Sequence, residues 1–514
     1  MSKDSFIQYI QEGYTSKGPF ITLGAAKYND ETCGEAHVKL PLKMWNRHGL
    51  IAGATGTGKT KTIQVLSEQL SLAGIPVLMM DIKGDFSGIA QPGVEQDFIK
   101  ERHQAIQVPY ETKAFPVELM SLSDQPGVRL RATVLEFGPV LLSRILDLND
   151  TQTGIMSIIF KYCDDHQLPL LDLKDLKKVL NYLTEEGKAE IEAEYGKISA
   201  ASTGTILRRI IELEQQGGDL FFGELSFDID DLMRVNNEGL GYVNILRLND
   251  IQDKPKLFST FMLSLLAEIY STLPEQGDAG QPELVIFIDE AHLIFKEASK
   301  TLSDQIETII KLIRSKGVGI YFITQNPMDV PSGVLSQLGL KIQHALRAFT
   351  AKDRQAIKQT AENYPLSDYY KTDQVLTSLG IGEALVTGLN EKGIPTPLAA
   401  TVLRSPMSRM DVLTESEIQA INQQSKLVRK YAETIDRDSA YEMLNRRIAT
   451  LEQENAQAKE QAEEAKAAKK TSTTTRKSNA DSIGTTIMKG LARTVTSATF
   501  IRGVFNMLAG GKRK

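Results

Sequence analysis

The stretch Gly53-Ala54-Thr55-Gly56-Thr57-Gly58-Lys59-Thr60 matches the pattern G-x-x-x-x-G-K-[ST] at every position. A loop that brings backbone N–H groups close to crowded phosphate oxygens needs residues without bulky side chains, which glycine provides. The lysine supplies a positive charge for the β and γ phosphates, and the final hydroxyl can bind Mg²⁺. The stretch therefore predicts a binding site for ATP or another nucleoside triphosphate, with Mg²⁺.

The residues on either side of this loop support the same interpretation. Before it, the apolar run 49–52 is typical of a buried strand; after it, Ile63, Leu66 and Leu70 recur at helical spacing until Gly74. A strand, a glycine loop and a helix in this order aim the helix N-terminus at phosphate. The alternative is a chance match to the pattern, which the flanking residues disfavour.

Composition limits the class of protein. The 514 residues are enough for about two to four domains, and the hydrophobic fraction of 41% and charged fraction of 24% are ordinary for a soluble protein. The two cysteines are far apart in sequence, which excludes a disulfide framework and a cysteine-rich metal site. The sequence shows neither an N-terminal signal segment nor an apolar run of about 18 residues. We therefore expect a cytoplasmic protein.

Charge is spread unevenly along the chain. Residues 465–514 hold eleven Lys or Arg residues and one acid, a net charge of +10, so the remainder carries −16 of the total −6. An acidic body with a basic tail indicates a tail that binds a polyanion, either nucleic acid or an anionic membrane surface. A solvated tail that only aids solubility is an equally good interpretation.

Polar residues follow three further apolar strands that we expect in the sheet. Asp81 ends the run 76–80, Asp289 and Glu290 end the run 284–288, and Gln325 follows the run 319–324. The carboxyl ends of parallel strands form the ligand edge of an α/β sheet. We expect Asp289 to join Thr60 in binding Mg²⁺, Glu290 to polarise the attacking water, and Gln325 to contact the γ phosphate.

Each of these assignments has a structural alternative. Asp81 can cap the next turn, the pair Asp289-Glu290 can cap a helix before Ala291, and Gln325 can be an ordinary turn residue at a strand end. The glycine loop upstream favours the catalytic interpretation for the acid pair. For Asp81 the two interpretations stay balanced.

Continuous apolar strands that alternate with amphipathic helices predict an α/β fold, with a mostly parallel sheet covered by helices on both faces. We expect its core in two parts, separated by an insertion in which we read 132–137 as a strand and 217–224 as a turn with exposed aromatics. Tyr441, Leu444, Ile448 and Leu451 form a short heptad seam, which favours a helix lying on the body over a long coiled coil. The expected divisions are a β segment (1–45), core (46–90), mixed α/β insertion (91–240), core (241–405), helical extension (406–470) and basic, partly disordered tail (471–514).

Several of these motifs together resemble a known family. They are the loop 50–60 preceded by Arg47-His48, the pair Asp289-Glu290, and the segment 324–327, which reads Thr-Gln-Asn-Pro where that family usually has Ser-Gln-Arg-Pro. They resemble the HerA–FtsK superfamily of ring-forming P-loop ATPases, most closely the bacterial HerA-like proteins of the YjgR type. The resemblance covers about residues 15–405 and the basic tail.

The resemblance implies a RecA-like core, a homo-hexameric ring and ATP-driven movement of DNA through a central pore, and it leaves a nuclease partner open. It implies that Lys59 and Thr60 bind phosphate and Mg²⁺, and that Asp289 is the Walker B acid. By the same resemblance, Glu290 is the catalytic base and Asp81 a site-lining acid.

A trans-acting arginine is also implied, and Arg47 and Arg314 are rivals for that role. Arg47 lies twelve residues before Lys59, so the intervening strand and loop carry it to the far end of the sheet. It is then out of reach of the γ phosphate on its own loop, but in a head-to-tail ring it can face the nucleotide of the next subunit. A surface arginine or an ion pair is the alternative.

The sequence thus predicts a Mg²⁺-dependent ATPase that drives DNA translocation or unwinding. The main alternative is an ATP-gated assembly or membrane-associated ATPase module that moves no nucleic acid. A monomeric nucleotide kinase is a weaker third possibility, because no lid for an acceptor substrate is recognisable.

Overall fold

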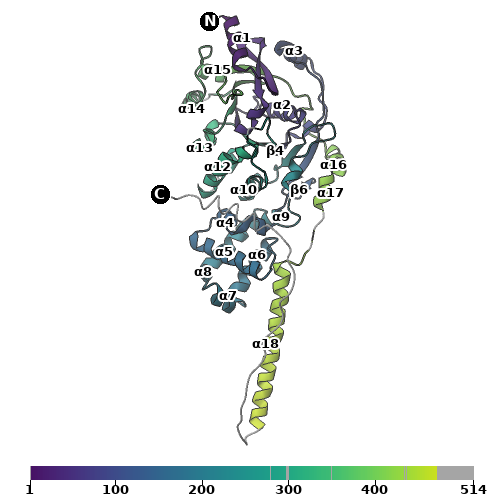
Figure 1. Cartoon of the computed structure of the whole chain (residues 1–514), viewed down its shortest axis with the longest axis vertical. Helices are drawn as coiled ribbons and strands as arrows, with labels where there is room; N and C mark the ends of the chain where they lie inside the picture. Colours follow the sequence, from purple (N-terminus) through teal and green to yellow (C-terminus); the bar gives the residue numbers. More distant parts are fainter. Residues whose placement is uncertain are drawn as a thin grey trace. The chain divides into compact units, whose positions relative to one another are not determined.

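The computed structural model describes residues 2–277, 279–296, 300–348, 350–432, 435 and 437–471. The described chain forms two compact units (Figure 1). The first comprises residues up to 132 together with 212–435, and the second comprises 133–211 with the described residues after 436. The predictions made for the basic tail after residue 471 lie outside the described residues.

A twelve-stranded sheet organises the first unit, in the order β2-β1-β12-β11-β10-β3-β9-β8-β4-β7-β5-β6. The eight strands from β10 to β6 are parallel, and β2, β1, β12 and β11 continue the sheet in antiparallel fashion. The predicted α/β fold with a mostly parallel sheet is therefore confirmed. The strands are β1 (Phe20–Tyr28), β2 (Glu31–Pro41), β3 (Gly49–Ala52), β4 (Val77–Asp81), β5 (Val117–Ser121), β6 (Val128–Arg129), β7 (Val243–Arg247), β8 (Leu284–Ile288), β9 (Val318–Thr324), β10 (Leu340–His344), β11 (Glu383–Thr387) and β12 (Ala399–Leu403).

Helices surround the sheet in the first unit. They are α1 (Lys3–Gly13), α2 (Lys59–Leu72), α3 (Asp97–Ile106), α9 (Gly218–Phe221), α10 (Pro255–Thr272), α11 (His292–Lys296), α12 (Lys300–Ile313), α13 (Ser332–Leu335), α14 (Ala351–Glu362), α15 (Thr372–Ser378), α16 (Glu415–Gln424) and α17 (Lys426–Ala432), with 3₁₀ turns η1 (Leu42–Arg47), η2 (Ser87–Ala90), η3 (Ile229–Leu232), η4 (Arg314–Lys316) and η5 (Pro327–Asp329). Among the described helices, none has both the length and the apolar character that a membrane span requires.

The central strands are apolar throughout because both faces of the sheet are covered. Every residue of β3, β4, β8 and β9 is buried, which is the pattern of an internal parallel strand. The glycine-rich loop connects β3 to α2, and β9 separates β3 from β8. The carboxyl ends of these strands therefore meet at one edge, where the polar residues predicted from the sequence follow them.

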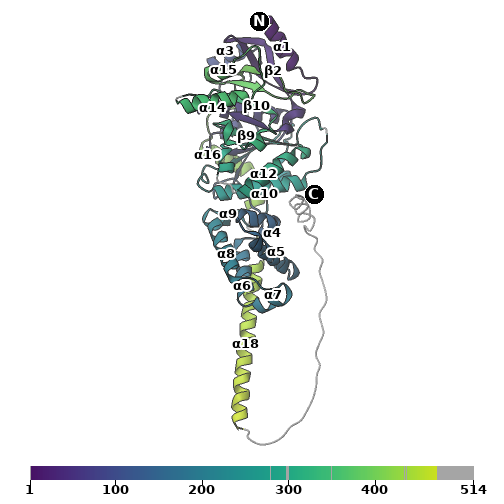
Figure 2. The ribbon, with the colours of Figure 1, turned by 90° about the vertical axis from the view of Figure 1, so that its left-hand side faces the viewer.

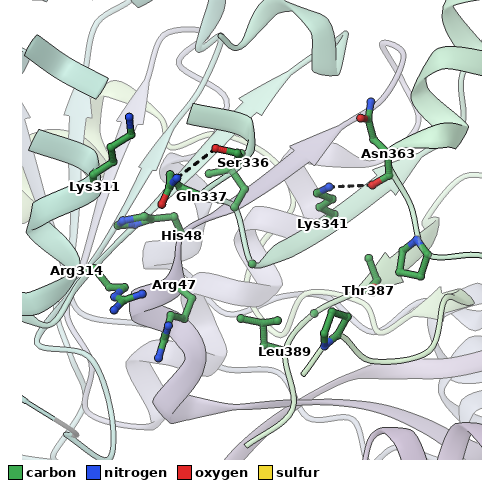
Figure 3. Close-up of a pocket in the computed structure, with 15 residues that line it drawn as sticks. Arg47, His48, Lys311, Arg314, Ser336, Gln337, Lys341, Asn363, Thr387 and Leu389 are labelled. Carbon is green, nitrogen blue, oxygen red and sulfur yellow. Dashed lines mark hydrogen bonds between the residues drawn. The ribbon is translucent and has the colours of Figure 1, made fainter. Parts of the chain in front are cut away.

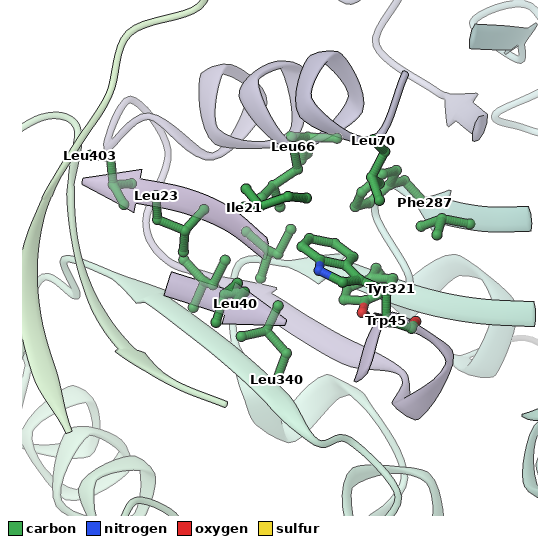
Figure 4. Close-up of a cluster of buried hydrophobic side chains, with 14 of the residues drawn as sticks. Ile21, Leu23, Leu40, Trp45, Leu66, Leu70, Phe287, Tyr321, Leu340 and Leu403 are labelled. Carbon is green, nitrogen blue, oxygen red and sulfur yellow. Dashed lines mark hydrogen bonds between the residues drawn. The ribbon is translucent and has the colours of Figure 1, made fainter. Parts of the chain in front are cut away.

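An aromatic cluster fixes η1 against β9 (Figure 4). The rings of Trp45 and Tyr321 lie 5.0 Å apart, and the Tyr321 hydroxyl donates a hydrogen bond of 3.0 Å to the Trp45 carbonyl. Phe287 of β8 packs on the same tyrosine with a ring separation of 5.4 Å. At Gly319 an added Cβ would lie 1.9 Å from the Trp45 carbonyl oxygen. This close packing positions Arg47, the last residue of η1.

The N-terminal segment differs from the expected short β segment, because helix α1 precedes β1. The Ser2 side chain accepts a hydrogen bond from the backbone N–H of Ser5 and caps this helix. Phe6 and Ile10, one turn apart, are fully buried. The sequence did not indicate this helix because it is short, and its two buried residues are too few to show a helical repeat of apolar positions.

The expected insertion at 91–240 packs separately only over residues 133–211, because α3, β5 and β6 belong to the first unit. The predicted strand at 132–137 is wrong. Thr133 and Glu136 form a reciprocal capping box that begins α4 (Val134–Ile145). The prediction of exposed aromatics at 217–224 is also wrong, since Phe221 and Phe222 are only 2% and 3% exposed.

The second unit is a group of helices on which α18 (Ala440–Thr471) begins (Figure 2). The N–H of Tyr441 donates to the Asp175 carboxylate at 2.8 Å, Arg447 pairs with Glu190 at 2.9 Å, and Leu444 is fully buried. The start of the helix thus packs on its own unit, whereas residues 452–462 are exposed. The other helices are α4, α5 (Asp150–Asp165), α6 (Leu173–Thr184), α7 (Lys188–Glu194) and α8 (Ala200–Gln215), of which residues from Glu212 onward are assigned to the first unit.

Residues 404–411, here called the strap, cross the helix that follows the glycine loop. The N–H groups of Met407 and Ser408 each donate to the carboxylate of Glu68 in α2 at 2.9 Å. Lys61, near the start of the same helix, donates to the Met410 carbonyl. Burial raises the pKa of Glu68 to about 7, although the hydrogen bonds from Met407 and Ser408 oppose the shift. The strap therefore fixes α2 from the side.

Candidate nucleotide-binding site

The backbone of the glycine-rich loop has the shape that phosphate binding needs. Gly53, Gly56 and Gly58 have φ values of +152°, +77° and +109°, which side-chain-bearing residues rarely adopt. A Cβ on Gly53 would lie 2.5 Å from the Cβ of His344, whereas one on Gly56 would meet nothing within 4 Å. The loop is therefore supported from behind and open in front, where phosphate oxygens would lie.

The helix that follows the loop contributes donors to the same space. Helix α2 begins at Lys59, and its N-cap residue Gly58 offers no side chain to the first N–H groups. These groups are then available to a phosphate. Ala54, Thr55 and Thr57 complete the loop, and the Thr57 hydroxyl ties it by donating to the Ala54 carbonyl at 2.7 Å.

Lys59 lies against the loop that it is expected to serve. Its ammonium donates to the carbonyls of Gly53 at 2.6 Å and Ala54 at 3.0 Å, and the residue is 8% exposed. Burial lowers the pKa of Lys59, and the charge of Lys83 lowers it further, whereas Glu290 acts in the opposite direction. A polyphosphate bound to the loop would supply the negative charge that this buried lysine needs.

The acid pair follows β8 and lies next to Lys83. Asp289 and Glu290 are 5% and 8% exposed. The Lys83 ammonium is 2.5 Å from Glu290 Oε1 and 3.7 Å from Asp289 Oδ2. Glu290 has a φ of 45°, an uncommon conformation for a residue other than glycine and one that often marks a functional site.

The two carboxylates have opposite pKa shifts. Burial raises the pKa of Asp289 to about 6, although the charge of Lys83 opposes the shift. Burial also acts to raise the pKa of Glu290. The hydrogen bond and charge of Lys83, with smaller effects from His292 and Gln325, outweigh it and leave that pKa below its ordinary value. Glu290 is thus ionised at neutral pH, as a base must be.

Asp81 lies at the same edge, but its oxygens are taken by the following turn. They accept hydrogen bonds from the N–H groups of Gly84 at 2.7 Å and Phe86 at 3.1 Å. This turn presents Lys83, and also Asp85, whose carboxylate accepts a bond of 3.3 Å from the Thr60 hydroxyl. The role of Asp81 as a nucleotide ligand stays a prediction.

Gln325 follows β9 and is exposed. Because β9 lies between β3 and β8, its end falls between the glycine loop and the acid pair. Gln325 makes a small contribution to the lowered pKa of Glu290. Asn326, the next residue, caps η5 by accepting from the Met328 N–H at 3.1 Å. The position of Gln325 suits the predicted contact with the γ phosphate and the attacking water.

The donor set fits a Mg²⁺ ion that arrives with a nucleotide. Within the described part of the chain, no three His, Cys, Asp or Glu side chains are grouped to hold a metal ion. Thr60 and Asp289 alone would leave most of the six positions around Mg²⁺ to phosphate and water oxygens. This is the usual composition of Mg²⁺ sites in nucleotide-binding proteins.

Both candidate arginines line a single cavity of about 470 Å³ (Figure 3). Arg47 precedes β3 and Arg314 precedes β9, so this cavity lies at the amino ends of the strands, opposite the glycine loop. Lys311 and Lys341 also line it, and none of its described lining residues is Asp or Glu. The cavity therefore suits an anion.

A buried histidine fixes the wall of this cavity. His48 accepts a hydrogen bond at Nδ1 from the Ile320 N–H at 3.0 Å, and its Nε2 lies 2.8 Å from the Ile310 carbonyl. Burial lowers the pKa of His48 to about 4, and Arg314 and Arg47 lower it further. The ring is thus neutral at pH 7, with the proton on Nε2, and it ties the segment before β3 to β9 and α12.

Comparison with known families identifies the chain. The family model described as the helicase HerA-like C-terminal region matches residues 27–514. The chain belongs to this family. The resemblance inferred from the loop, the acid pair and the segment after β9 is therefore confirmed, and the protein is a P-loop ATPase.

Two curated relatives cover much of the chain. One is the DNA double-strand break repair helicase HerA of Sulfolobus acidocaldarius, which is 21% identical over 73% of this chain and 68% of that protein. The other is a probable helicase, MJECL08, of Methanocaldococcus jannaschii, which is 26% identical over 73% of this chain and 69% of that protein.

Two solved structures are also similar to the chain. The plasmid coupling protein TrwB with an ATP analogue covers 78% of this chain and 100% of that chain, with 14% identity and a TM-score of 0.48. VirB4 of Thermoanaerobacter pseudethanolicus covers 79% and 100%, with 14% identity and a TM-score of 0.46.

Proposed function

We propose that this HerA-like ATPase hydrolyses ATP with Mg²⁺ and uses the energy to translocate or unwind DNA as a ring of identical subunits. One observation carries the proposal. The phosphate-binding loop after β3, the acid pair after β8 and Gln325 after β9 meet at one edge of the sheet. Phosphoanhydride hydrolysis requires a loop that binds phosphate, acids that contact the metal and the water, and a group such as the Gln325 amide that contacts both the γ phosphate and the water.

The chemistry divides among these residues by charge and position. Lys59 neutralises the β and γ phosphates, while Thr60 and Asp289 hold Mg²⁺, which neutralises phosphate charge when bound. Glu290, whose pKa lies below its ordinary value, accepts a proton from the attacking water. Gln325 orients that water and reports whether a γ phosphate is present.

A ring would complete each site with an arginine from the neighbouring subunit. Arg47 and Arg314 line the same cavity at the opposite edge of the sheet (Figure 3). A head-to-tail contact between subunits brings that edge towards the next nucleotide. An arginine supplied in this way contributes about 10³–10⁵-fold to rate in other phosphoryl-transfer enzymes. Arg47 and Arg314 therefore belong to one basic surface, and either of them can supply the trans-acting guanidinium.

DNA is the proposed substrate because the HerA relative is a DNA double-strand break repair helicase by name. The test is the steady-state ATPase rate with and without single- and double-stranded DNA at low salt, alongside the mass in solution. We expect DNA to raise the rate of an oligomer, and removal of residues 472–514 to flatten the salt dependence of DNA binding. Lys59→Ala serves as the inactive control. An absence of stimulation by every DNA form would reject the proposal.

A second candidate rests on the +10 charge of residues 465–514. An ATP-gated or membrane-associated module would use this tail to bind an anionic surface. Sedimentation with vesicles of anionic lipid, compared with neutral vesicles, separates the candidates. Binding that depends on the tail and the anionic lipid, with an ATPase indifferent to DNA, would favour this second function.

A further inference from the structure

Lys83 has no assigned part in the proposed reaction, yet it lies at its centre. It follows β4 in a turn that the Asp81 carboxylate fixes through three backbone N–H groups. Its ammonium bonds Glu290 at 2.5 Å and lies 3.7 Å from Asp289. The Lys83 side chain is 39% exposed, so it has room to move, whereas the acids it contacts are nearly buried.

The contacts of Lys83 oppose a metal ion at the same carboxylates. Mg²⁺ binds carboxylate oxygens at about 2.0–2.1 Å, and a lysine charge at 3.7 Å from Asp289 opposes a second cation there. On Glu290 the lysine contacts Oε1 and leaves Oε2 to other donors. Metal binding at Asp289 therefore needs Lys83 to give way.

The geometry points to Lys83 as an internal counter-ion that keeps bare Mg²⁺ from the acid pair and releases both carboxylates when the γ phosphate of ATP attracts its ammonium. The inference rests on the proposed ATP site. Lys83 is then a positioning residue that discriminates ATP from ADP. In ADP no γ phosphate competes with Glu290 for the lysine.

The surroundings of Lys83 identify the γ phosphate as its second partner. Asp85, in the same turn as Lys83, accepts a hydrogen bond of 3.3 Å from Thr60, the residue after Lys59. The two ammonium groups therefore border the same space, one from the loop before α2 and one from the turn after β4. A terminal phosphate in that space would contact both. The unbranched, rotatable stem of lysine allows the short movement from carboxylate to phosphate.

The first test measures metal binding without nucleotide, by the EPR signal of free Mn²⁺ during titration of the full-length protein. Lys83→Met removes the charge and keeps the length of the side chain. We expect it to bind Mn²⁺ at least about fivefold more tightly than the wild type, the smallest effect of a unit charge at about 4 Å even in bulk water. Lys83→Arg should retain weak binding. Lys100→Met, at a surface lysine of α3, is the matched control. Equal Mn²⁺ affinity of Lys83→Met and wild type would overturn the inference.

The second test compares the affinities for a slowly hydrolysed ATP analogue and for ADP. Lys83→Met should lower the preference for the triphosphate at least about fivefold, and Lys83→Arg should restore most of it. A preference unchanged in Lys83→Met would refute the release by γ phosphate. The proposed function fails separately, if the wild type binds neither nucleotide or hydrolyses none. Even if the proposed function fails in this way, the Mn²⁺ titration still tests whether Lys83 opposes metal binding at the acid pair.

Discussion

The substitution Glu290→Gln separates nucleotide binding from hydrolysis most directly. Glutamine has nearly the same size and can still accept a hydrogen bond from Lys83, but it is a far weaker base. Loss of a general base typically lowers the rate about 10²–10⁴-fold, which corresponds to about 2.7–5.4 kcal/mol in the activation barrier. Stability should change much less. The substitution removes one of the two negative charges beside Lys83 and keeps an acceptor for it. Because the Lys83 side chain is 39% exposed, we expect the lost charge to cost about 0–1 kcal/mol.

The assay is single-turnover hydrolysis of ATP, with binding of a fluorescent ATP analogue and thermal unfolding measured on the same samples. We expect analogue affinity within about threefold of wild type, a small shift in unfolding temperature, and a rate lower by at least about 10². Glu101→Gln, at an exposed residue of α3, controls for the change in charge. A rate within tenfold of wild type would show that the reasoning is wrong and that Glu290 has only a structural role.

Further predictions address other parts of the molecule. Lys59→Ala should abolish hydrolysis and weaken nucleotide binding in equilibrium titrations; unchanged affinity would contradict the placement of the site. Arg47→Ala and Glu290→Gln subunits, each inactive, should regain partial ATPase activity when mixed, and mixed oligomers that form but stay inactive would exclude a trans role for this arginine. The pKa of Glu68 is raised to about 7, above its unfolded value, so its ionisation destabilises the fold. The contribution of Glu68 to thermal stability should therefore fall as pH rises from about 4.5 to 7, so the unfolding temperature of the wild type should fall relative to that of Glu68→Gln over this range; parallel pH dependences would refute the assignment. Gly319→Ala should lower the unfolding temperature markedly, because its Cβ would lie 1.9 Å from the carbonyl of the protein's single tryptophan; an unchanged temperature would contradict this packing.

The sequence predicted those parts of the fold in which local pattern and burial agree. β3, β4, β8 and β9 are continuous apolar runs because both of their faces are covered. Their polar C-terminal neighbours were therefore readable as the ligand edge. The loop 53–60 was readable because each glycine meets a backbone requirement that other residues meet poorly.

Other features depend on contacts that a sequence does not display. The pair of Lys83 with Glu290 joins the ends of two strands that are neighbours in the sheet but about 200 residues apart in sequence. Thr133 begins a helix rather than a strand because its capping box with Glu136 outweighs the β-branched residues around it. The sequence does not predict the strap, because residues 404–411 show neither a helical nor a strand pattern of apolar residues. Its position depends on the hydrogen bonds to Glu68.

Strand β9 has a consequence for neighbouring subunits in a ring. Its seven residues span about 23 Å, from the arginine cavity at one edge to Gln325 at the other, and every one of them is buried. Because it is buried and paired on both sides, we expect this strand to move as a unit. It is called the rod below. In an assembled ring, one end of each rod would lie in its own subunit's nucleotide site and the other would face the neighbouring one. A displacement of Gln325 at one site would then be felt at the arginine edge that faces the next subunit.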